Sequence, residues 1–149
     1  MRNECIYFEQ RSVKRAPELV PLSREHHEAL VLARRACEPQ RTGAEPAALR
    51  EHVLQRWAEQ FEPHFAAEEQ VLLPALAAAG AEAAAATAWR QHRGLHAPIA
   101  LVRAGDRSAL PRWGAAMREH VRFEERELFP LAQRELDLAP LTAGLSRPD

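Results

Sequence analysis

Cysteine is scarce in this chain of 149 residues. Its two cysteines, Cys5 and Cys37, lie far apart and form no Cys-x-x-Cys pair. Two thiols are too few for a disulfide framework, and without paired spacing they do not indicate a zinc–cysteine or iron–sulfur site. We expect both to be free thiols in a reducing compartment.

Long apolar runs are also missing. The most apolar stretch, residues 71–89, is mostly alanine and is interrupted by Pro74, Gly80 and Glu82, so we do not expect it to span a membrane. The first 15 residues lack the apolar core of a secretory signal, and a cytoplasmic location is therefore predicted. The net charge of −1 gives no reason to expect nucleic acid or an anionic membrane as a partner.

Strand signals are absent too. No stretch alternates apolar and polar residues, and no Asn-Gly or Asp-Gly hairpin turn occurs. Helical patterns instead cover residues 23–37, 46–80, 83–102 and 108–138, with Ser23 as the expected first cap and Gly80 as an expected C-terminal cap. These segments predict an all-α fold, an antiparallel up-down-up-down four-helix bundle over residues 21–138. An N-terminal arm (1–20) and a C-terminal tail (139–149) flank it.

One motif occurs twice and indicates an internal repeat of a helix hairpin. Residues 57–74 contain Trp57, His64, Glu68, Glu69 and Pro74, and the same residue types recur 56 residues later as Trp113, His120, Glu124, Glu125 and Pro130. Four residues along an α-helix turn the chain by only about 40° net, so the histidine and glutamate of each copy share a face. An imidazole and a carboxylate so placed can bind one metal centre.

The other two helices add histidines. His92 and His96 are four residues apart and face one way, while adjacent His26 and His27 cannot both point inward. Leu30 shares a face with His26, so we expect His26 to be the buried one; His27 and His52 are expected at the surface. The candidate metal site then contains seven inward groups: His26, His64, Glu68, His92, His96, His120 and Glu124.

Seven nitrogen and oxygen ligands exceed what one transition metal needs, so they predict two ions bridged by carboxylates. Imidazole with carboxylate suits iron, while zinc and manganese stay open on this chemistry. No His-Glu-x-x-His zinc motif and no Glu-x-x-His di-iron motif occurs.

The chain resembles the hemerythrin-like (HHE cation-binding) family over roughly residues 22–135. The segments that carry the resemblance are REHHEAL, HFAAEEQVLLPAL, QHRGLHAPI and HVRFEERELFPL. The resemblance implies a non-haem di-iron centre (Fe2+/Fe3+) with an oxo or hydroxo bridge. One iron would take His92, His96 and His120, the other His26 and His64, with Glu68 and Glu124 bridging. Oxygen carriers of this family use an aspartate five residues after the histidine, so Glu125 is the alternative bridge and reversible O2 carriage is in question.

The implied function is binding or sensing of O2, NO or peroxide at the open position of the two-histidine iron. Alternatives are a di-iron enzyme that disproportionates peroxide or repairs nitrosative or oxidative damage, and iron storage or delivery. Sensing would require a partner or a homodimer to relay the signal, and the sequence does not identify a redox partner. Trp57 and Trp113 would pack in the core or shield the open iron position.

Overall fold

The computed structural model describes residues 14–38 and 44–146, and every element in these ranges is a helix. Cys5 and the rest of residues 1–13, the loop 39–43, and residues 147–149 lie outside the described residues. The elements are η1 (Pro17–Leu19), α2 (Val20–Cys37), α3 (Ala44–Arg56), η2 (Trp57–Phe61), α4 (Glu62–Ala67), η3 (Glu68–Leu72), α5 (Leu73–Ala78), α6 (Glu82–Arg103), α7 (Ala109–Phe123), η4 (Glu124–Leu128), α8 (Phe129–Glu135), η5 (Ala139–Leu141) and α9 (Thr142–Leu145).

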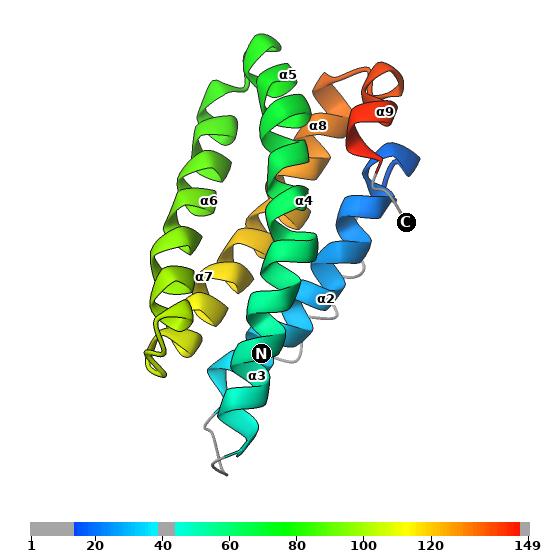
Figure 1. Ribbon diagram of the computed structural model, residues 1–149. Helices are drawn as coiled ribbons and strands as arrows, with labels where there is room; N and C mark the ends of the chain where they lie inside the picture. The colour runs from blue at the N-terminus through cyan, green and yellow to red at the C-terminus, as the bar shows by residue number, and fades with distance from the viewer. Residues whose placement is uncertain (1–13, 39–43, 147–149) are drawn as a thin grey trace, which may run out of the picture.

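Four long helical stretches lie side by side along one direction (Figure 1): α2, the continuous run α3 to α5, α6, and the run α7 to α8. The predicted all-α class is confirmed. Gly80, at φ 92°, follows α5 as the predicted capping glycine. Ser23 does not cap the first helix, because η1 and α2 already begin at Pro17 and Val20. None of the helices in the described part of the chain has the length and apolar character needed to cross a bilayer.

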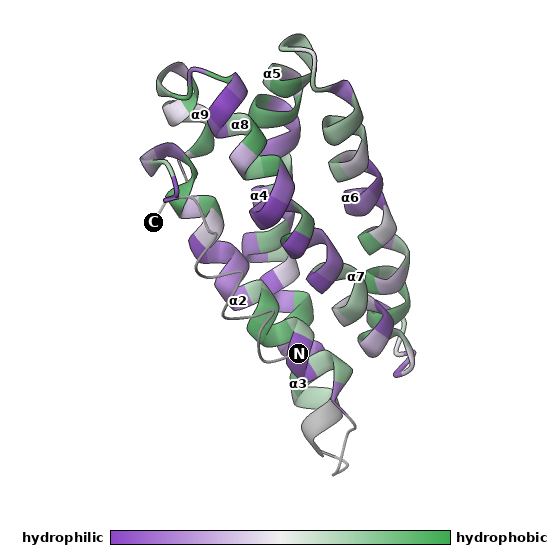
Figure 2. Cartoon of the chain, turned by 180° about the vertical axis from the view of Figure 1, so that it is seen from behind, coloured by the Kyte–Doolittle hydropathy of each residue, from purple (hydrophilic) through white to green (hydrophobic). Residues whose placement is uncertain are grey.

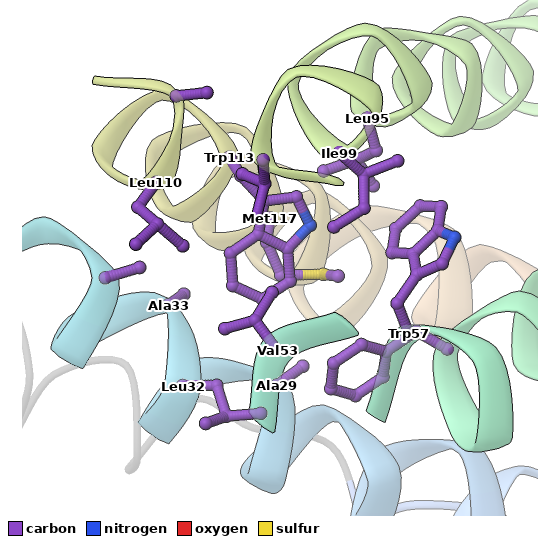
Figure 3. Packing of buried hydrophobic residues seen from close by; sticks show 14 of the residues in the cluster. Ala29, Leu32, Ala33, Val53, Trp57, Leu95, Ile99, Leu110, Trp113 and Met117 are labelled. Atoms are coloured by element: carbon purple, nitrogen blue, oxygen red, sulfur yellow. The ribbon is translucent and has the colours of Figure 1, made fainter. Parts of the chain in front are cut away.

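Buried apolar side chains form two clusters. The first apolar cluster is drawn from residues 29–36, 49–65, 95–102 and 109–121. Figure 3 shows part of it, with Trp57, Trp113 and Met117 packed among aliphatic side chains. The second apolar cluster is drawn from residues 19–22, 72–76, 85–88 and 128–145. Of the predicted ligands, His26, Glu68, His92 and Glu124 fall between the two clusters along their helical stretches. His64 and His120 come one residue before the first cluster ends, and His96 lies within its range.

The order of the two clusters reverses from one stretch to the next. Along α2 the second cluster comes before the first; along α3 to α5 the first comes before the second; α6 and then α7 to α8 repeat this alternation. Each long helix also carries both polar and apolar residues (Figure 2), as expected for helices with one face in a shared core.

Three π-helical turns, η2, η3 and η4, interrupt the second and fourth stretches, and each ends two residues before a proline: Pro63, Pro74 and Pro130. Proline has no N–H to donate, so the carbonyl four residues earlier cannot form its α-helical hydrogen bond. A π turn accommodates this by i→i+5 bonding. The kinks predicted at Pro63 and Pro74 therefore take the form of π turns.

The π turns also keep the core residues facing inward. Buried residues around each copy of the motif follow in steps of four, as in His64, Glu68, Leu72 and Leu76. In an α-helix each such step drifts by about 40°, so three steps would move the side chain around the helix. The wider turns at Glu68–Leu72 and Glu124–Leu128 offset this drift. Each begins at the carboxylate of its motif, and the two carboxylates are 56 residues apart.

The outer face of α2 differs from expectation. Leu30 and Val31 are exposed, at 37% and 48%, although Leu30 was the reason for choosing His26 as the inward histidine. The inward stripe of α2 runs instead through Leu22, His26, Ala29 and Leu32.

Cys37 is a free thiol, as predicted. In the tail, Leu145 is buried in the second apolar cluster, so the described part of the tail packs on the helices.

Candidate metal centre

Six of the seven predicted ligands are brought together at the level between the two apolar clusters. His26 comes from α2, His92 from α6, and the pairs His64–Glu68 and His120–Glu124 from the two copies of the motif. All six are buried, with exposures from 0% to 3%. They form the polar layer of an otherwise apolar core.

Each histidine presents its Nε2 atom to the two central carboxylates. Glu124 Oε1 lies 3.0 Å from His26 Nε2, and Glu124 Oε2 lies 3.4 Å from His120 Nε2. Glu68 Oε1 lies 3.0 Å from His92 Nε2, and Glu68 Oε2 lies 3.3 Å from His64 Nε2. Each carboxylate therefore offers one oxygen to either side of the centre.

The ligand atoms fall into two sets that share both carboxylates. One set is His26, His64, Glu68 and Glu124; the other is Glu68, His92, His120 and Glu124, with all atoms of a set within 4.8 Å of one another. In both sets two imidazoles face two carboxylates. Two such sets joined by shared carboxylates are the arrangement needed to hold a pair of ions.

His96 does not join this cluster. It is exposed, and its ring centroid lies 5.5 Å from that of Trp57, at an interplanar angle of 88°. The buried stripe of α6 continues after His92 through Leu95, Ile99 and Val102, in steps of three and four. The four-residue step from His92 to His96 leaves this stripe, and it also advances about 6 Å along the helix, past the polar layer. The expected three-histidine set is therefore not assembled.

The opposite ring nitrogen of each buried histidine also has a partner. His26 Nδ1 lies 2.7 Å from Glu125, His64 Nδ1 3.2 Å from Glu25, His92 Nδ1 2.5 Å from Glu69, and His120 Nδ1 2.8 Å from Gln91. Carboxylate and amide oxygens only accept, so each Nδ1 carries the hydrogen. In a neutral ring the lone pair is then on Nε2 and points to the centre.

These four partners brace the helices in a closed circuit. Each partner is next to a central residue in the sequence but serves the histidine of another helical stretch. Glu25 of α2 holds His64, Glu69 of η3 holds His92, Gln91 of α6 holds His120, and Glu125 of η4 returns to His26 on α2. Sequence analysis left Glu69 and Glu125 outside the ligand set but did not single out Glu25 or Gln91. Their adjacency to His26 and His92 is the signal that would have found them.

The central atoms suit a metal better than a hydrogen-bond network. Buried polar atoms normally have a hydrogen-bond partner. Yet no hydrogen bond of good geometry forms at Nε2 of His26, His64 and His120, at Oε2 of Glu68, or at either carboxylate oxygen of Glu124. All of these atoms point into one small volume. Imidazole nitrogens with carboxylate oxygens are a donor set for iron, manganese or zinc, and metal coordination would satisfy every one of them.

Without a metal, protons are shared unequally in this cluster. At His64 burial opposes a charge, but the carboxylates of Glu68, Glu124 and Glu25 together outweigh it, so the pKa of His64 lies well above its ordinary value. Burial would raise the pKa of Glu68, but the charge of His64, together with hydrogen bonds to Glu124, His64 and His92, holds it well below its usual range. Burial lowers the pKa of His120 to about 3. A metal would replace the protons held by such groups.

Aromatic rings close both ends of the polar layer. Phe65 of the first apolar cluster stacks on His92, with ring centroids 4.3 Å apart, and also borders His120. Phe129 of the second apolar cluster stacks on His26 at 5.3 Å and 9°. Trp57 and Trp113 belong to the first apolar cluster, as the core-packing interpretation predicted. The centre is thus enclosed by apolar side chains, a setting that limits water access.

A family model agrees with this geometry. The model described as the hemerythrin HHE cation binding domain matches residues 19–132. The matched segment contains all six clustered side chains and all four of their outer partners, Glu25, Glu69, Gln91 and Glu125. No curated protein and no solved structure matched the chain.

Proposed function

Because the chain belongs to the hemerythrin HHE cation-binding domain family, we propose that it is a di-iron protein that binds or senses O2, NO or peroxide. His26 and His64 would hold one iron, His92 and His120 the other, and Glu68 and Glu124 would bridge the pair. The observation that carries the proposal is the orphaned set of Nε2 and carboxylate oxygen atoms converging on one buried volume. The reversal of cluster order along the chain supports an antiparallel four-helix bundle built from two hairpins around this site.

Two histidines on each side leave room for a further ligand. Iron sites with two histidines and carboxylate ligands characteristically keep open coordination positions. A bound iron pair here would supply a redox-active centre to which a small molecule can bind. The protein's own part is to orient the imidazoles through Glu25, Glu69, Gln91 and Glu125, and to keep bulk water away with Phe65 and Phe129.

The second candidate function is a di-iron enzyme that consumes peroxide or repairs nitrosative or oxidative damage. The absence of His96 from the cluster favours it, because both ions then keep open positions and neither has the three-histidine set of the oxygen carriers. Among the described residues, the titratable groups at the centre are the six clustered side chains and the carboxylates among the outer partners of the histidines. The chemistry would therefore belong to the metal pair.

Metal analysis followed by anaerobic reduction and stopped-flow mixing tests the proposal. Two irons per chain and a spectrum that changes on adding O2 or NO, then reverses when the gas is removed, support binding. Rapid irreversible oxidation with peroxide turnover supports the enzyme. A protein that takes up no iron under these conditions contradicts both.

A further inference from the structure

Glu69 and Glu125 occupy the same place in the two copies of the motif but have different surroundings. Each accepts a hydrogen bond from Nδ1 of a buried histidine, His92 or His26. Glu125 is also bound by Ser23 Oγ at 2.8 Å and by Arg15 Nη2 at 3.2 Å. Within the described residues, Glu69 has His92 as its one recorded partner. Nothing in the repeat itself accounts for this difference.

Arg15 and Ser23 make the asymmetry, and Arg15 is the charged member of the two. It precedes η1, and its side chain is only 13% exposed. Besides the Glu125 carboxylate, it binds the Glu125 backbone carbonyl at 3.2 Å and Gln133 Oε1 at 3.2 Å. Its guanidinium carbon also lies over the ring of Phe129, 5.3 Å from the centroid. Arg15 thus contacts several groups whose positions are fixed by η4 and α8.

Both Glu125 and Phe129 in turn hold His26. Glu125 binds its Nδ1 atom, and Phe129 stacks against its ring face. One guanidinium therefore fixes the rotation of the imidazole through an edge contact and a face contact. The hydrogen bond between Glu125 and His26 is the contact that joins the fourth helical stretch to the first in the closed circuit of outer partners.

We propose that Arg15 is a positioning residue for His26, and that the position formed by His26 and His64 consequently takes up its ion before the position formed by His92 and His120. This inference rests on the proposed metal site. A ligand whose partner is already fixed loses less freedom when it binds, whereas Glu69 must be ordered when His92 binds an ion.

Charge and orientation predict opposite results, which makes the inference testable. Arg15 is a cation near a cation site, so charge alone predicts that its removal strengthens metal binding. Positioning predicts that its removal weakens binding, because loss of a partner that orients a metal ligand typically costs about 10–100-fold in affinity.

The test is a calorimetric titration of the metal-free protein with Zn2+, comparing wild type with Arg15→Gln and Arg15→Lys. We expect Arg15→Gln to weaken the first binding step about tenfold and to leave the second within about twofold. Arg15→Lys keeps the charge but not the planar guanidinium, so its affinity in the first binding step should lie between those of the wild type and Arg15→Gln. Arg56→Gln is the matched control, because it removes a half-buried arginine paired with Glu28 that contacts none of the six central side chains.

Histidine ring NMR of the metal-free proteins gives a second readout. The Nδ1 proton of His26 should exchange with water faster in Arg15→Gln and Arg15→Lys, and not in Arg56→Gln. Equal or tighter Zn2+ binding by Arg15→Gln, or unchanged exchange at His26, overturns the role of Arg15 while leaving the metal site intact. A wild-type protein that binds no Zn2+ and no iron overturns the proposed function as well.

Discussion

The ring of His96 lies edge-on to Trp57 of the first apolar cluster, with the ring centroids 5.5 Å apart, and outside both sets of ligand atoms. His96→Ala should therefore leave the metal content of the protein unchanged, because its imidazole is exposed and outside both ligand sets. His27→Ala and His52→Ala are the controls, since both residues are exposed. Metal analysis of the purified variants checks this. Loss of one ion from His96→Ala would restore the three-histidine set that the resemblance implied.

Glu68 and Glu124 each face histidines of both sets, so each should be needed for both ions. Glu68→Gln and Glu124→Gln should reduce the bound iron from about two ions per chain to well below one. His64→Ala should reduce it to about one and destabilise the fold, because metal binding to the native state adds to its stability.

Glu127→Gln is the matched control, because Glu127 lies in the same π turn as Glu124 but is exposed. Iron analysis and thermal unfolding of the four variants measure the effect. Full iron content in either Gln variant of a central carboxylate would show that the carboxylates do not bridge the ions.

The clustered side chains, His96 and Leu30 show what helical periodicity in the sequence can and cannot predict. The helices and six of the clustered side chains followed from helical spacing and from the duplicated motif. His96 was misjudged because the four-residue step from His92 leaves the buried stripe of α6 and also moves one turn along the helix, past the polar layer. Leu30 was misjudged because the stripe of α2 passes on the other side of His26, through Ala29 and Leu32.

Contacts between helices could not be predicted in this way. The hydrogen bonds from His64 to Glu25 and from His120 to Gln91 depend on how neighbouring helices are rotated against each other. The sequence of one helix does not determine that rotation. The π turns are an intermediate case. Pro74 and Pro130 showed that the helix must change there, but the core packing of Glu68 and Glu124 decides that the change is a wider turn.

The metal-free protein should be most stable near pH 6.5, the ordinary pKa of histidine. Burial lowers the pKa of His120 to about 3, so below pH 6.5 the unfolded chain binds a proton that the folded protein does not, and stability falls with pH. The pKa of His64 is raised well above its ordinary value, so above pH 6.5 the folded protein keeps a proton that the unfolded chain has lost, and stability falls as pH rises.

Urea unfolding of the metal-free protein between about pH 4 and pH 9 measures this profile. His27→Ala, which changes an exposed histidine, should give the same curve. Stability that rises steadily from pH 6.5 to pH 9 would contradict the raised pKa of His64.

Gly114 sets the distance between α7 and α2, the helices that carry His120 and His26. A Cβ atom at this position would lie 2.6 Å from the backbone oxygen of Ala33 and 2.9 Å from Cys37 Sγ. Gly114→Ala should therefore lower the free energy of unfolding by about 1–3 kcal/mol, since the backbone of α2 must move. Gly94→Ala, where nothing lies within 4 Å, should raise it by about 0.5–1 kcal/mol. Chemical unfolding of both variants tests the pair, and a stabilised Gly114→Ala would contradict the close approach.

The most direct test of the two-ion site is crystallography of the iron-loaded protein at the iron absorption edge. We expect two anomalous peaks per chain, one bound by His26 and His64 and the other by His92 and His120, with the carboxylates of Glu68 and Glu124 between them. A single peak, or an iron bound by His96, would contradict the account.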